Sequence, residues 1–202
     1  MTLLAKHPEV RTLRTQLRDN CVLRHLNAAE WRALEPLLEV TEYAKGATLE
    51  HQGDRSQEQY FVIEGVLKRT VANAQGKEMI LRFAAETDID TSYAAWRLKT
   101  PIPYSIRTVT KVRAAKLPME QWVSFLERHP IFKSEFDFEI MKLMSEVMAH
   151  TITLHLLDAS GRLKRFERKH AELAARLPRK ELASYLNLTP ETLSRLERRI
   201  RS

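Results

Sequence analysis

The sequence predicts an α+β protein in which an N-terminal antiparallel β-roll (a jelly roll) is followed by a long helix and a C-terminal helix-turn-helix. Short runs of β-branched and aromatic residues, separated by turns that contain glycine, fill the chain before Pro118. A long stretch without proline or glycine comes next, and the end of the chain has helix-turn-helix spacing. We therefore predict three parts: residues 1–117, a helical lead-in and β-roll; 118–158, connecting helices; and 159–202, the helix-turn-helix unit.

Composition points to an ordinary water-exposed protein. Of the 202 residues, 44% are hydrophobic and 29% are charged, and no apolar run reaches the roughly 18 residues that a membrane span needs. The first ten residues lack the pattern of a secretory signal, so we expect no membrane partner. The single cysteine, Cys21, cannot form an intramolecular disulfide, which fits a cytoplasmic location. It also excludes an iron–sulfur cluster held by several cysteines of one subunit.

The excess positive charge lies entirely in the last part of the chain. Residues 162–202 carry 12 Lys and Arg against 5 Asp and Glu, which accounts for the whole formal net charge of +7. A localised basic surface of this kind is typical of polyanion binding, although a solvated basic helix surface would give the same count.

The first 117 residues combine a helical start with short strands. Up to residue 40 the pattern is helical, with Asn27 as an N-cap and Glu30 at its N3 position. Five strand-like runs then recur between turns: Tyr60–Ile63, Val66–Val71, Met79–Phe83, Ser105–Val109 and Val112–Leu117. Their spacing of roughly 8–12 residues is typical of an antiparallel sandwich or barrel.

The stretch from Phe136 to Leu157 predicts one long helix with two apolar stripes. One stripe has heptad-like spacing, and we assign it to the interface of a twofold dimer; it consists of Ile140, Leu143, Val147, His150, Leu154 and Leu157. The second consists of Met141, Met144, Met148 and Ile152. Because both stripes must be covered, one is expected on the β-roll and one on a partner helix; burial of the whole helix within one subunit is the alternative. Residues 158–161 are expected to break this helix and form a hinge.

Local signals predict the helix-turn-helix. Ala183 supplies the small residue where two helices cross, and Asn187 tolerates the positive φ of the turn. Thr189 is placed to cap the second helix, with Pro190 at its first position. Leucines hold the pair together: Leu182, Leu186, Leu188, Leu193 and Leu196. A generic helical hairpin could satisfy part of this pattern by chance.

The second helix of this motif has a polar face suited to the DNA major groove. Glu191, Ser194 and Arg195 lie at i, i+3 and i+4, and we predict that they read bases, since Arg can bond guanine and Glu can accept from cytosine. Contacts to the DNA backbone are predicted for the flanking polar and basic residues. These are Thr189, Arg179, Lys180, Arg198 and Arg199.

With these motifs in place, the chain resembles the cyclic-AMP receptor protein/FNR (CRP/FNR) family of bacterial transcription regulators over nearly its whole length. Lys45-Gly46, residues 52–54 and 60–65 resemble the glycine turns of that family's cyclic-nucleotide-binding-like β-roll. The spacing of Glu191, Ser194 and Arg195 is similar to the FNR branch, which implies a TTGAT-type half-site in a palindrome. The resemblance implies a homodimer, double-stranded DNA and RNA polymerase as partners. The end at Ser202 resembles a shortened subgroup without the β-wing.

Two departures from the family bear on the effector. The family's Gly-Glu and Arg-Ser or Arg-Thr pairs, which hold the ribose and phosphate, are replaced here by residues 88–91 and by Pro103-Tyr104. Without the arginine and with added aspartates, a phosphate would bind poorly, so we expect no tight cyclic-AMP binding. The effector is unknown, and its pocket is predicted around Asp88, Asp90, Trp96 and Tyr104. The cysteine cluster of FNR is also missing.

Other sites have weaker support. His150 could ligate haem or a metal, or act as a pH-sensitive contact, but a tolerated polar residue in a helix seam is the simpler explanation. An acidic turn explains Asp88 and Asp90 better than a cation site, so we predict neither a metal nor a cofactor. The chain lacks catalytic motifs, so we predict no enzyme. Two alternatives to a DNA-binding regulator stay open: a ligand-binding module that docks its basic end on a partner protein, and a haem-based gas sensor.

Overall fold

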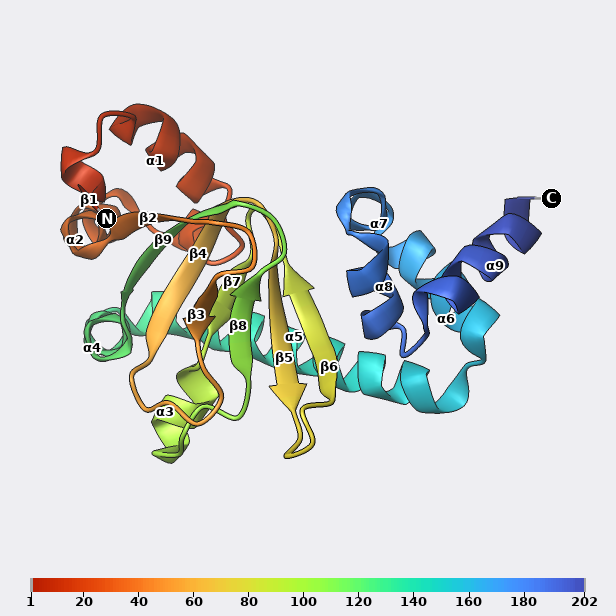
Figure 1. The fold of residues 1–202 in the computed structure, drawn as a ribbon. Helices are drawn as coiled ribbons and strands as arrows, with labels where there is room; N and C mark the ends of the chain where they lie inside the picture. The colour runs from red at the N-terminus through yellow and green to blue at the C-terminus, as the bar shows by residue number, and fades with distance from the viewer. Residues whose placement is uncertain (1, 202) are drawn as a thin grey trace.

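A computed structural model describes residues 2–201, so the predicted outer boundaries at residues 1 and 202 lie outside the described residues. Figure 1 shows a β-roll and a helical C-terminal unit joined by one long helix, α5. The N-terminal part contains strand β1 (Thr2–Leu3), helices α1 (Val10–Arg18) and α2 (Ala28–Leu34), and the 3-10 turns η1 (Leu4–Lys6), η2 (Leu23–His25) and η3 (Glu35–Leu37). The predicted capping of α2 is confirmed, because the Asn27 side chain accepts from the Glu30 N–H at 3.0 Å and Glu30 accepts from the Asn27 N–H at 2.8 Å.

Two antiparallel sheets form the roll, which confirms the predicted α+β class. The first sheet has the order β1-β2-β9-β4-β7 and the second β3-β8-β5-β6. The remaining strands are β2 (Glu39–Tyr43), β3 (Thr48–Glu50), β4 (Glu58–Glu64), β5 (Leu67–Ala72), β6 (Glu78–Ala84), β7 (Ile89–Thr91), β8 (Ser105–Thr108) and β9 (Val112–Pro118). All five predicted strands are present. Strand β2 and the very short strands β1, β3 and β7 were not predicted; the short ones are too brief to show a period.

Aromatic rings tie the roll to the helices that follow it. Helices α4 (Met119–Arg128) and α5 (Pro130–Leu156) begin directly after β9. Trp122 is fully buried, with its ring 5.4 Å from Phe61 of β4 and 5.2 Å from Phe136 of α5 in edge-on contacts. The short helix α3 (Tyr93–Leu98) joins the same cluster, because Tyr93 lies 5.0 Å from Phe136. The first half of α5 is therefore fixed against the roll.

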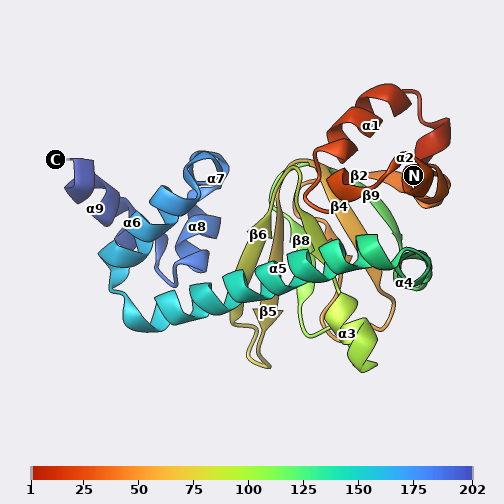
Figure 2. The same ribbon diagram turned by 180° about the vertical axis from the view of Figure 1, so that it is seen from behind.

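The two apolar stripes of α5 lie on different faces of the helix, and the predicted assignment of the first stripe to a dimer interface is wrong for the part that packs within its own chain. Leu143 is buried in the core of its own chain, and Ile140 and Val147 pack against that core, so this part of the stripe is already covered. The second stripe is exposed: Met141 is 63%, Met144 49%, Met148 64% and Ile152 50% accessible. Figure 2 shows α5 running along the outside of the roll. The free apolar face is the methionine stripe.

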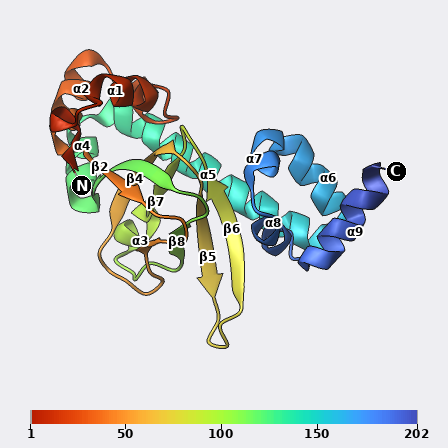
Figure 3. The ribbon, with the colours of Figure 1, turned by 45° about the horizontal axis from the view of Figure 1, so that its top comes forward.

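Four helices form the C-terminal unit: α6 (Ala159–Lys169), α7 (Ala171–Arg176), α8 (Arg179–Tyr185) and α9 (Pro190–Arg201). The break before α6 is shorter than the predicted hinge, because Gly161 already lies inside α6. Its N–H donates to the Asp158 side chain at 2.7 Å, which caps the helix. Figure 3 shows α8 beside the edge strand β6 of the roll. The core of this unit includes Val66 and Phe83 from the roll.

Candidate functional site

The crossing of α8 and α9 has the predicted helix-turn-helix geometry. Ala183 is fully buried between the helices, and Asn187 adopts the left-handed conformation with φ of 52°. The Leu188 N–H donates to the Ala183 carbonyl at 2.8 Å, which closes the turn. Arg162 of α6 donates to the Leu186 carbonyl at 2.7 Å and so satisfies the C-terminal end of α8. The role of Arg162 was not foreseen, because its partner is distant in the sequence.

Helix α9 buries one face and exposes the other. The Thr189 hydroxyl accepts from the Thr192 N–H at 3.2 Å, so the predicted cap is present. Leu193 is fully buried, whereas Glu191 and Arg195 are exposed and Ser194 is half-buried. A hydrogen bond from its own backbone N–H and one from the Thr189 hydroxyl lower the pKa of Glu191, which keeps this carboxylate ionised. The outer face of α9 therefore presents a carboxylate, a hydroxyl and a guanidinium together.

The flanking cations differ in how they are held. Arg179 forms an ion pair with Glu197 of α9, so its guanidinium also braces the two helices. Arg198 donates weakly to the Ser194 carbonyl at 3.4 Å, and its side chain remains exposed, as does that of Arg199. Lys180 is exposed at the start of α8. These positions suit phosphate contacts, with Arg179 the most constrained of them.

Contacts around Tyr185 dock the helix-turn-helix unit on the rest of the chain. The Tyr185 ring stacks on His150 of α5 with centroids 3.7 Å apart, and it lies 5.1 Å from Phe83 of β6. Two ion pairs also join this unit to the roll: Lys68 to Glu181 at 2.8 Å, and Arg176 to Glu86 at 2.6 Å. The position of the helix-turn-helix unit relative to the roll is thus set by aromatic packing and by these two ion pairs.

His150 belongs to this packing and is a poor haem ligand. Burial lowers the pKa of His150 to about 4, so the imidazole is neutral near pH 7. The cavity beside it has a volume of about 40 Å³, which holds little more than a water molecule. Within residues 2–201, we find no cluster of three or more His, Cys, Asp or Glu that could hold a metal ion.

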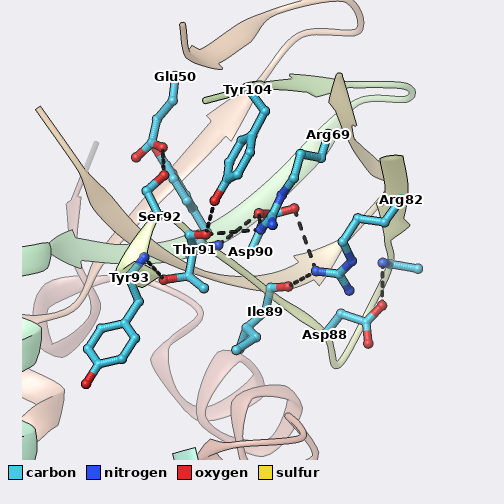
Figure 4. A network of polar contacts seen from close by, with 12 residues as sticks. Glu50, Arg69, Arg82, Asp88, Ile89, Asp90, Thr91, Ser92, Tyr93 and Tyr104 are labelled. Atoms are coloured by element: carbon cyan, nitrogen blue, oxygen red, sulfur yellow. Dashed lines mark hydrogen bonds and ion pairs between the residues drawn. The ribbon is translucent and has the colours of Figure 1, made fainter. Parts of the chain in front are cut away.

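The interior of the roll holds a charge pair where an anionic ligand would need a cation (Figure 4). Arg69 of β5 is 3% exposed and pairs with Asp90 of β7, which is fully buried. The Arg69 guanidinium also donates to the Thr91 carbonyl at 3.0 Å and lies 4.0 Å above the Tyr104 ring. Tyr104 donates to the same carbonyl at 2.7 Å. Asp90 therefore already neutralises the arginine that was missed in the sequence.

The four residues predicted to form one effector pocket do not lie together. Asp90 and Tyr104 belong to the Arg69 network. The Asp88 carboxylate accepts from the Ala85 N–H at 2.9 Å, in the turn before β7. Trp96 lies on α3, where it lines a separate surface hollow. A single pocket built from these four side chains is therefore not supported.

Glu50 is a second buried acid of the roll. It is 4% exposed and accepts a hydrogen bond from the Ser92 hydroxyl and another from the Glu58 N–H at 2.7 Å. Burial outweighs these bonds and raises the pKa of Glu50 to about 7. The roll thus contains a carboxyl that changes charge near neutral pH.

Comparison with known proteins agrees with this architecture. Residues 40–129 match the family model of the cyclic nucleotide-binding domain. The nitrogen fixation regulation protein FixK of Bradyrhizobium diazoefficiens is 28% identical over 190 residues, which cover 89% of this chain and 78% of FixK. The chain is therefore similar to regulators of the CRP/FNR family, and its β-roll matches the cyclic nucleotide-binding domain.

More distantly similar proteins share the fold. The cAMP-activated global transcriptional regulator CRP of Salmonella typhimurium is 19% identical over 61% of this chain and 59% of its own length. The chain therefore matches less than two thirds of CRP. A solved CooA mutant from Carboxydothermus hydrogenoformans superimposes with a TM-score of 0.74 at 20% identity, covering 92% of this chain and 87% of CooA. No helix among residues 2–201 is long and apolar enough to cross a bilayer.

Replacement of Glu50 by glutamine should stabilise the protein above pH 7 but not at pH 4.5. An unfolded carboxyl titrates near 4.3 and the native one near 7, so the unfolded chain loses its proton first and stability falls as pH rises between these values. The loss of stability is at most about 4 kcal/mol. The glutamine side chain of the variant stays neutral at every pH, so the variant does not lose this stability. Thermal unfolding of Glu50→Gln against the wild type from pH 4.5 to 8 measures the difference; Glu64→Gln, at the exposed end of β4, is the control. A difference that does not change with pH would contradict the assignment.

Proposed function

We propose that this protein is a transcription regulator of the CRP/FNR type that binds a palindromic DNA site as a homodimer through α9. The observation that carries the proposal is the exposed face of α9, where Glu191, Ser194 and Arg195 share one side of a helix within the basic unit. On a duplex, Arg195 would donate to guanine O6 and N7, and Glu191 would accept from cytosine N4. The surrounding cations would neutralise phosphates and set the register.

A dimer is needed because one short helix reads only a few base pairs. The methionine stripe of α5 supplies a matching surface: it is apolar, it is exposed, and it lies on a helix of 27 residues. A twofold axis along this helix would cover the same stripe of both subunits at once. The two α9 helices would then meet half-sites about one DNA turn apart.

The roll is proposed to regulate DNA binding without tight binding of cyclic AMP. A cyclic nucleotide phosphate would have to compete with Asp90 for Arg69, and would approach the carboxylate of Glu50 as well. Removing Asp90 from its buried pair leaves an uncompensated charge, which is costly. A contact with RNA polymerase stays a prediction from the family resemblance.

Arg195→Ala and Lys180→Ala should weaken DNA binding in different ways. Loss of Arg195 should cost about 1–3 kcal/mol on the matched site and relax base preference at one position, because a bidentate base contact is removed. Loss of Lys180 should weaken matched and scrambled duplexes alike and lower the salt slope by about one, since a phosphate contact is lost.

Binding isotherms on matched and scrambled duplexes at several salt concentrations separate these outcomes. If the two variants lose the same affinity on both duplexes, the assignment of roles fails. If the wild type binds no duplex in a salt-dependent way, docking of the basic unit on a partner protein becomes the better explanation.

Met148→Glu should convert the dimer to a monomer. Each subunit would place a carboxylate in the middle of the buried stripe, opposite its copy, and the dimer Kd should rise at least about 100-fold. Gln75→Glu, which adds the same charge at the exposed tip of the β5–β6 hairpin, should leave the dimer intact. Sedimentation velocity over a concentration series measures both. Equal dimerisation of the two variants would contradict the interface.

A further inference from the structure

A surface hollow beside α3 lies outside the Arg69 network and outside the DNA-binding unit. It has a volume of about 600 Å³ and is bounded by the loop between β3 and β4 on one side and by α3 on the other. The principal lining residues are Arg55, Gln57, Trp96, Arg97, Lys99 and Thr100. Figure 1 shows this loop passing next to α3. Two backbone hydrogen bonds fix the loop: Gly53 N–H to the Ile102 carbonyl at 2.8 Å, and Ile102 N–H to the Asp54 carbonyl at 2.9 Å.

The charged side chains that line this α3 hollow are all positive. Three cations line it, and none of its described lining residues is acidic. The nearest acid in the loop sequence, Asp54, directs its carboxylate to the His51 N–H at 3.2 Å. The ion pair with Asp137 raises the pKa of Lys133 of α5, and the nearby positive charge of Arg97 opposes that rise. Like charges gathered in this way repel one another, and an anion between them would remove the repulsion.

Lys99 reaches the hollow from a backbone conformation that rarely suits a lysine. It ends α3 in the left-handed region with φ of 56°, where glycine is the usual residue. Its N–H donates to the Ala95 and Trp96 carbonyls, so the conformation is held by the helix end. A lysine at a position that favours glycine is a reason to propose a role for its side chain.

Two further groups give the hollow a chemical preference beyond charge. Trp96 is half-buried, with part of its indole packed on the main core and part lining the hollow. Gln57 is 9% exposed; its amide nitrogen donates to the Thr100 carbonyl at 3.4 Å, while its amide oxygen has no hydrogen-bond partner among residues 2–201. A ligand with a hydroxyl or amine could donate to this oxygen, and an apolar or flat part could lie against the indole.

We propose that the α3 hollow binds a phosphorylated small molecule with at least two negative charges, and that this molecule acts as the effector. The first half stands on the hollow alone, whereas the second rests on the proposed function. Arg55, Arg97 and Lys99 hold the phosphate groups, Gln57 accepts from a ligand donor, and Trp96 contacts the organic part. The site differs from the interior of the roll, where Asp90 occupies the arginine.

A physical route connects the hollow to the rest of the molecule. Helix α3 follows β7 with Ser92 alone between them, so a shift of α3 acts directly on Thr91, which accepts from Arg69 and Tyr104. At this same N-terminal end of α3, Tyr93 packs on Phe136 of α5. Because α5 carries both the methionine stripe and His150, occupation of the hollow can change the arrangement of the DNA-binding units.

Inorganic pyrophosphate titrated into the full-length protein without DNA tests the site. Calorimetry and tryptophan fluorescence should show one pyrophosphate per chain, bound more weakly as salt increases, and no comparable binding of cyclic AMP, which has a single charge. Arg97→Glu should raise the pyrophosphate Kd about tenfold, whereas Lys77→Glu, an equal charge change in the distant β5–β6 hairpin, should leave it unchanged.

Lys99→Gly separates a ligand contact from a structural role. Glycine suits the left-handed backbone, so this variant should melt at the same or a higher temperature than the wild type while its pyrophosphate Kd rises severalfold. If Arg97→Glu and Lys99→Gly both bind pyrophosphate like the wild type, or if Lys77→Glu weakens binding as much as they do, the site is refuted.

The effector role is tested by measuring duplex affinity with and without pyrophosphate. A change in affinity that disappears in Arg97→Glu supports it; the same change in that variant indicates competition at α9 and overturns it, as does no change at all. Pyrophosphate binding without any duplex binding would support the site in the α3 hollow and refute the proposed function. Duplex binding without pyrophosphate binding would support the proposed function and refute the site.

Discussion

The opposite exposure of the two apolar faces of α5 is the constraint on which the rest of the structure depends. One face closes the aromatic core of the roll through Phe136 and Leu143, and the other leaves the methionine stripe in solvent. Farther along the same helix, His150 stacks on Tyr185 of α8. A single helix therefore packs on the roll, carries the free apolar surface and contacts the helix-turn-helix unit, which makes it the element through which these parts can be coupled.

The polar interior of the roll changes what the fold can sense. Two oppositely charged side chains, Arg69 and Asp90, are paired in the interior, and Tyr104 covers the arginine. Such a pair is stable only while both partners remain, since either charge alone would be buried without compensation. The roll therefore has the architecture of a cyclic nucleotide-binding domain, while the polar groups of its interior are paired with one another. Recognition of an effector is then expected at the surface, where the cations beside α3 have no acidic neighbours lining the same hollow.

Features set by neighbouring residues could be predicted from the sequence, and features set by distant contacts could not. The cap at Asn27, the left-handed Asn187 and the start of α9 at Thr189 follow from local hydrogen bonds. The choice between the two stripes of α5 depends on where the roll lies, which helical periodicity does not encode. The pairing of Arg69 was not predicted because Asp90 is 21 residues away in the sequence. The predicted effector pocket around Asp88, Asp90, Trp96 and Tyr104 does not form, because Trp96 lines the hollow beside α3 and Asp90 does not.

In-vitro selection of random duplexes by the purified protein tests most directly whether two α9 helices read DNA as a pair. The account predicts enrichment of a twofold-symmetric motif whose half-sites lie about one helical turn apart, around 10 base pairs from centre to centre. Enrichment of a single asymmetric half-site would contradict the dimer, and a pool that stays random would contradict base reading by α9 altogether.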